Sequence, residues 1–119
     1  MFKKAITYTD YDGVERTETF YFNFTKAECT QLQFSVPGGM DKMLERLATS
    51  LNGPEMVDIY TMIIKKAYGE KSPDGRRFIK SEQLSNEFEQ TPAFSELFME
   101  LVSDDKAMEE FIANVFPKA

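Results

Sequence analysis

The sequence predicts an α+β fold, in which an N-terminal antiparallel β-hairpin is followed by a bundle of about six short-to-medium α-helices. Apolar side chains recur at every second position up to Phe24, which is the period of a strand. Beyond Phe24 they recur at every third or fourth position, which is the period of an amphipathic helix. The 119 residues suffice for one hydrophobic core. We therefore expect a single domain over residues 1–119, with the hairpin in residues 1–24 and the helices in residues 25–119.

The register of the hairpin depends on the turn between its strands. The Asp12-Gly13 pair suits a two-residue turn, but that turn would set even-numbered positions opposite odd-numbered ones and split the apolar face. A three-residue loop from Tyr11 to Gly13 keeps even opposite even, with Gly13 in the left-handed bulge position. The predicted cross-strand pairs are Asp10 with Val14, Tyr8 with Arg16, Ile6 with Glu18, and Phe2 with Phe22.

Residues 54–68 form the most apolar helical stretch, and we expect this helix to be central. Its apolar side chains fall on one broad stripe. Pro54 suits the first helical turn, where its missing N–H costs nothing, and Gly69 suits a left-handed position just past the end. The stripe consists of Met56, Ile59, Tyr60, Ile63, Ile64, Ala67 and Tyr68, widened by Val57 and Met62.

Two helices are predicted before the central one. Thr25 and Glu28 match a capping box, which starts a helix that ends near Ser35. The apolar positions of residues 40–51 then repeat with helical spacing, and Asn52-Gly53 closes this second helix. Because so short a turn precedes the central helix, we expect the second and central helices to be antiparallel neighbours.

The segment after the central helix begins with a turn and ends with three more helices. Pro73 fixes the backbone angle that starts the turn, and Gly75 can adopt the positive φ that ends it. Phe78 and Ile79 are then expected to return to the core as a short extended piece. The predicted N-caps of the last three helices are Ser81, Thr91, and either Ser103 or Asp104.

The composition excludes several classes of site. The chain has no histidine, which excludes Ser-His-Asp and Cys-His catalytic arrangements and histidine-bound zinc. Its one cysteine, Cys29, excludes an internal disulfide and agrees with a reducing compartment. No apolar run approaches the roughly 18 residues that span a bilayer, and the N-terminus lacks a signal-peptide stretch. We expect a soluble intracellular protein that is not an enzyme and has no metal, cofactor or membrane contact.

The net charge of −6 is unevenly distributed. Residues 81–119 hold nine acidic against two basic residues, whereas residues 1–80 hold eleven against twelve. A basic loop facing an acidic helical region suggests attraction within the fold or between copies, and the alternative is a solvated surface. Nucleic-acid binding is not favoured, because the basic region is small and the protein acidic. The basic residues after the central helix are Lys65, Lys66, Lys71, Arg76, Arg77 and Lys80.

Two stretches, residues 67–81 (AYGEKSPDGRRFIKS) and residues 87–101 (EFEQTPAFSELFMEL), resemble the tail assembly chaperones of long-tailed, siphovirus-type bacteriophages. Residues 8–13 and 20–28 are similar to the start of the same family, so the resemblance covers nearly the whole chain. It implies a non-enzymatic chaperone in the host cytoplasm that binds the long helical tape-measure protein, keeps it soluble and helps recruit tail-tube subunits. The alternatives are a structural tail or head-completion protein and a small nucleic-acid-binding regulatory protein.

Four phenylalanines are the candidate partner-binding residues: Phe94, Phe98, Phe111 and Phe116. Short helices rich in phenylalanine, together with an open hairpin edge, offer more apolar surface than a small domain readily buries. We therefore expect self-association into a homo-oligomer or binding of a helical partner through this surface. The alternative is that the four side chains fill one core, which we expect for at least two of them. If all four are buried, the basic region of residues 65–80 is the next candidate.

Overall fold

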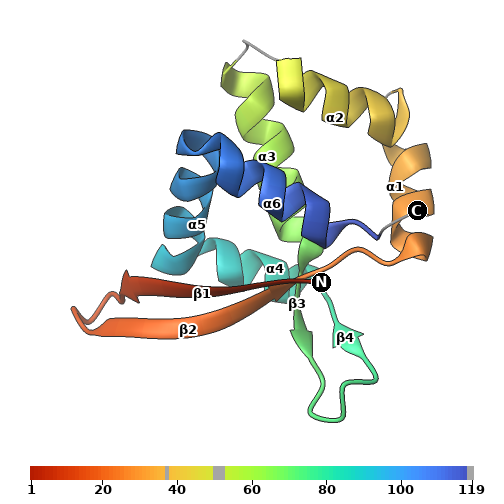
Figure 1. The fold of residues 1–119 in the computed structure, drawn as a ribbon. Helices are drawn as coiled ribbons and strands as arrows, with labels where there is room; N and C mark the ends of the chain where they lie inside the picture. Colours follow the sequence, from red (N-terminus) through yellow and green to blue (C-terminus); the bar gives the residue numbers. More distant parts are fainter. Residues whose placement is uncertain (37, 50–52, 118–119) are drawn as a thin grey trace.

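The computed structural model describes residues 1–36, 38–49 and 53–117. They form the predicted α+β fold, in which an N-terminal hairpin is followed by six helices (Figure 1). Four strands make one antiparallel sheet in the order β1-β2-β3-β4. The strands are β1 (Phe2–Thr9), β2 (Glu15–Phe22), β3 (Tyr68–Lys71) and β4 (Phe78–Ile79). The helices are α1 (Lys26–Ser35), α2 (Gly39–Thr49), α3 (Gly53–Ala67), α4 (Glu82–Glu89), α5 (Pro92–Ser103) and α6 (Asp105–Val115).

The first hairpin has the predicted register and turn. Phe2 lies opposite Phe22, and the even-to-even pairing continues along both strands. The Asp10 N–H donates to the Val14 carbonyl at 2.8 Å, which closes the three-residue loop. Gly13 has a φ of 82°, the left-handed conformation that favours glycine. The register puts the apolar even-numbered side chains of both strands on one face, as expected.

That apolar face packs against the helices, which lie on one side of the hairpin (Figure 1). The buried side chains form one continuous cluster with contributions from the hairpin and the helices. Ile63 and Ile64 of α3 are each 1% exposed, so the third helix is central, as predicted. Phe22 is fully buried, and its ring contacts those of Phe2, Tyr68, Phe88 and Phe111.

The predicted end of the central helix is wrong. The helix ends at Ala67, and Tyr68 begins strand β3, which pairs with the end of β2. Asn23 directly follows β2, and its N–H donates to the Ala67 carbonyl at 2.8 Å. The last residue of α3 is therefore already hydrogen-bonded beside the end of β2. Tyr68 also stacks on Phe88, with ring centroids 4.3 Å apart. The free edge of β2 and this aromatic partner therefore override the local helical pattern.

Gly69 serves close packing rather than the left-handed cap that the sequence predicts. Its φ lies outside the left-handed range. A Cβ at this position would lie 2.7 Å from the Phe78 ring and 2.8 Å from the Ile79 carbonyl oxygen. Only a residue without a side chain allows β3 and β4 to approach so closely. Phe78 is half-buried and Ile79 is exposed, and neither belongs to the core cluster of the described residues or packs against it, so the predicted return to the core is wrong.

Substituting Gly69 by alanine is expected to lower stability by about 1–3 kcal/mol, because the new methyl group overlaps a backbone oxygen as well as a ring. Gly13→Ala is the matched comparison, since nothing lies within 4 Å of the Cβ that it adds and only the left-handed backbone opposes it. Thermal melting of both variants checks this. A Gly69→Ala melting temperature equal to that of the parent would contradict the tight β3–β4 contact.

The helix termini mostly follow the sequence. Thr25 and Glu28 form the predicted capping box, and Ser81 and Thr91 cap α4 and α5. Asp104, rather than Ser103, caps α6. The expected antiparallel arrangement of α2 and α3 is wrong, because Figure 1 shows α2 extending from the beginning of α3 toward α1 and not running alongside α3. Of the predicted closure at Asn52-Gly53, Asn52 lies outside the described residues, and Gly53 is the first residue of α3.

Candidate partner-binding groove

A groove of about 720 Å³ lies between α1, α3 and α4. Its size falls within the range of about 300–1,000 Å³ that is typical of ligand pockets. Apolar side chains from three separate segments contribute to it, namely Phe24, Leu32 and Met62. Charged and polar side chains surround these residues. The remaining lining residues are Glu28, Gln31, Ser35, Lys65, Lys66, Lys80, Ser81, Glu82, Ser85 and Asn86.

Lys80 holds together the elements that border the groove. Its ammonium group donates to the Asn23 carbonyl at 2.6 Å, to the Lys66 carbonyl at 2.7 Å and to the Glu28 carboxylate at 2.7 Å. A lysine has three donors, so all three are used. The ammonium group also lies 4.8 Å from the centroid of the Phe24 ring, within the range of a cation–π contact. Lys80 therefore joins the end of the first hairpin, α1 and the end of α3.

The pKa values of this pair reflect its partial burial. Burial opposes ionisation of Glu28, but the hydrogen bonds from the Lys80 ammonium and the Thr25 N–H outweigh it and hold the pKa of Glu28 below its usual value. Burial lowers the pKa of Lys80, and the hydrogen bond and charge of Glu28 only partly offset that effect. Both shifts agree with an ion pair that forms in a partly dehydrated position. Lys80 is a structural residue of the groove.

Further polar contacts fix α3 against α4. Lys65 and Glu89 form an ion pair at 2.9 Å, and the Ser85 hydroxyl donates to the Lys65 carbonyl at 2.7 Å. The predicted attraction between the basic region and the acidic C-terminal helices therefore exists within the fold at Lys65. Lys66 is exposed beside the groove. The groove thus combines three apolar side chains with a mostly polar lining, in which two lysines lie along the α3 border.

The four predicted phenylalanines occupy three different environments. Phe111 is fully buried between Phe2 and Phe22, so it is not available at the surface. Phe116 is half-buried and stacks on the groove residue Phe24, with ring centroids 4.9 Å apart. The remaining two, Phe94 and Phe98, are half-buried together on α5, with ring centroids 6.0 Å apart.

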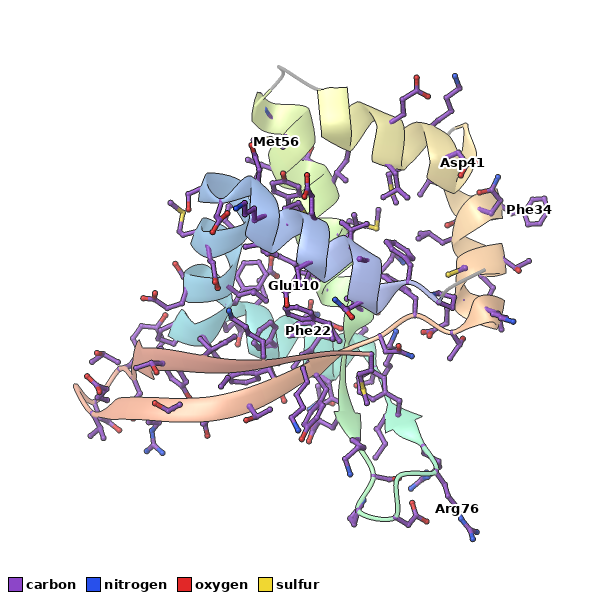
Figure 2. The ribbon with its side chains drawn as sticks, viewed as in Figure 1. Phe22, Phe34, Asp41, Met56, Arg76 and Glu110 are labelled. Carbon is purple, nitrogen blue, oxygen red and sulfur yellow. The ribbon has the colours of Figure 1, made fainter. Side chains whose placement is uncertain are left out.

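Phe34 of α1 is an exposed aromatic residue that was not among the predicted partner-binding residues. It is 87% exposed, and Figure 2 shows its side chain pointing away from the body of the protein. Its exposure could have been predicted from helical geometry, because Phe34 lies about 200° around the helix from Leu32, the buried residue of α1. The groove itself could not be predicted in this way, because Leu32 and Met62 carry the pattern of ordinary core residues.

The described part of the chain has neither a metal-site cluster nor a membrane-spanning helix. Within it, no three or more cysteine, aspartate or glutamate side chains gather as a metal site would require. None of its helices has both the length and the apolar character needed to cross a bilayer. Cys29 is free and half-buried, and burial raises the pKa of its thiol. A thiol that stays protonated has low reactivity, so Cys29 is an inert residue of the fold.

A groove between short helices that combines a few apolar side chains with a polar border can accept one face of a helix of another protein. The comparison with known families identifies the class more closely. The chain belongs to the phage tail assembly chaperones, since the model of that family matches residues 1–119. No curated protein and no solved structure matches the chain.

Proposed function

We propose that this chaperone binds the phage tape-measure protein in the host cytoplasm without catalysing a reaction. Binding would keep the tape-measure protein soluble and help recruit tail-tube subunits. Membership of the tail assembly chaperone family supports this proposal. The observation that carries it is the groove between α1, α3 and α4, whose apolar residues Phe24, Leu32 and Met62 offer a place for one face of a helical segment.

The groove suits one face of an amphipathic helix. Such a helix would insert apolar side chains against Leu32 and Met62 while its acidic side chains pair with Lys66. Methionine is flexible and polarisable, so it adapts to partner side chains of different shapes. Phe116 stacks on the groove residue Phe24 and so lies beside the groove. We propose that Phe94 and Phe98, on α5, form a second contact with the tape-measure protein, separate from the groove.

Met62→Gln is expected to weaken capture of the tape-measure protein at least tenfold, because it replaces one of the three apolar side chains of the groove by a polar one. Met99→Gln is the matched control, since Met99 of α5 is 56% exposed and does not line the groove. Each variant is coexpressed with the tape-measure protein, and the retained partner is quantified by pull-down. Circular dichroism and melting separate a lost surface from a lost fold.

Phe98→Gln in the same assay tests the α5 surface. Loss of capture by Met62→Gln alone supports the groove, whereas loss by Phe98→Gln alone moves the binding surface to α5. Equal capture by the parent and both folded variants would contradict both surfaces. If the parent chain does not retain the tape-measure protein at all, the proposed function itself is wrong.

The structural-protein alternative rests on the open edge of β2. Strand β3 pairs with Tyr21 and Phe22 only, so the described structure gives residues 15–20 no strand partner on that side. A strand from a neighbouring protein would complete this edge by β-augmentation. Stable incorporation of the chain into finished tails would support this alternative, and its absence from them would favour the chaperone function.

A further inference from the structure

The loop between β3 and β4 carries two arginines away from the body of the protein. Figure 2 shows Arg76 at the tip of this loop. Both Arg76 and Arg77 are exposed, and in the described part of the chain neither belongs to an ion pair. Asp74 is the acidic residue of the loop, and one of its carboxylate oxygens accepts from the Ser72 hydroxyl at 2.7 Å and the Arg76 N–H at 3.0 Å. The two guanidinium groups therefore remain available to another molecule.

The loop holds its shape through hydrogen bonds centred on Ser72. This serine is 3% exposed, and its N–H donates to the Arg77 carbonyl at 2.9 Å. The Arg77 N–H in turn donates to the Ser72 hydroxyl at 3.0 Å, and the Gly75 N–H donates to the Ser72 carbonyl at 2.9 Å. A loop ordered in this way loses little conformational entropy on binding. The arginines are thus presented by an ordered backbone.

A complementary acidic surface lies on α6. The exposed residues Asp105, Glu109 and Glu110 form what we call the α6 acidic face, which also carries the exposed Lys106 between Glu109 and Glu110 and so keeps a net charge of −2. Among the described residues none of the four belongs to an ion pair. Two other acids of the C-terminal region, Glu89 and Glu100, are already paired with lysines. In Figures 1 and 2 the α6 helix lies among the helices, while the arginine loop projects beyond the sheet. The two charged surfaces are therefore not paired within one copy.

We propose that the loop bearing Arg76 and Arg77 of one copy binds the α6 acidic face of a second copy. The contact joins two different surfaces, so it is heterologous and continues head to tail into a ring or an open chain. Charge complementarity sets the orientation of such a contact. Nucleic acid is a weaker candidate, because a chain of net charge −6 repels phosphates outside this small loop. The proposal uses neither the groove nor the tape-measure protein, so the two proposals stand separately.

The test measures self-association of the purified chain by sedimentation velocity at low and high ionic strength. The parent is expected to associate at low salt and to dissociate as salt screens the contact. A loop variant, Arg76→Glu with Arg77→Glu, and a helix variant, Glu109→Arg with Glu110→Arg, should each weaken association at least tenfold. All four side chains are exposed, so both variants should keep the parent circular dichroism spectrum and melting temperature.

Mixing the two variants provides the decisive result. The loop variant has two acidic surfaces and the helix variant has two basic ones, so a mixture is expected to restore association in alternating order. A single chain with all four substitutions should also associate again. A monomeric parent at every salt concentration, association that survives either charge reversal, or a mixture that stays monomeric would overturn the proposal. DNA binding that only the loop variant loses would overturn it too, by assigning the loop to phosphates.

Discussion

Ile63→Asp is expected to unfold the protein or drive it into aggregates. Ile63 lies on the central helix α3 and is 1% exposed within the hydrophobic core. A carboxylate at this position is removed from water. The cost of burying it equals or exceeds the free energy of unfolding of a typical domain, which is about 5–15 kcal/mol. Far-ultraviolet circular dichroism and sedimentation of the expressed protein measure the effect.

Lys71→Ala is the control for this substitution. Lys71 is exposed on β3, and a change there is expected to alter stability by less than about 0.5 kcal/mol. The two variants should therefore differ in kind, one failing to fold and the other melting like the parent. Equal shifts in melting temperature would mean that α3 is not the centre of the core.

Lys80→Met is expected to destabilise the protein by roughly 2–4 kcal/mol. The substitution keeps the apolar stem but removes three hydrogen bonds from the ammonium group, which link Asn23, Lys66 and Glu28. It also leaves the Glu28 carboxylate without its cation in a partly buried position. Urea unfolding measures the change in the free energy of unfolding.

Lys65→Met is the matched control for the Lys80 substitution. Lys65 forms one ion pair, with Glu89, and both side chains are partly exposed, so its loss should cost about 0–1 kcal/mol. Equal effects of the two substitutions would show that the Lys80 network contributes no more than a surface ion pair. Retention of the Lys65 variant's tertiary structure would be confirmed by near-ultraviolet circular dichroism.

The Lys80 network also makes the free energy of unfolding depend on pH in the acid range. The pKa of Glu28 is lower in the folded protein than in the unfolded chain, where a glutamate has a pKa of about 4.3. Its contribution to stability is therefore present above that pH and is lost as the pH falls through the lower, folded value. Because Lys80→Met removes one of the interactions that lower this pKa, the variant should lose less stability over the same pH interval.

The candidate surface was only partly predictable from sequence. Phe111 and Phe116 belong to the same helical pattern, yet one side chain is fully buried and the other is half-buried on Phe24. Periodicity shows which side of a helix is apolar, but not how far the neighbouring elements cover it. The groove residues Leu32 and Met62 come from different helices, so the space between them depends on how those helices are packed.

Local chemistry determined the first hairpin and the helix starts. The turn at Gly13, the alternation of Ile6 and its neighbours and the capping box at Thr25 each involve residues a few positions apart, so the sequence alone was enough to predict them. Tertiary structure decided the rest. Tyr68 is in a strand because the edge of β2, distant in sequence, offers it hydrogen-bond partners. Lys80 is a structural residue because folding brings three acceptors from other segments to its ammonium group.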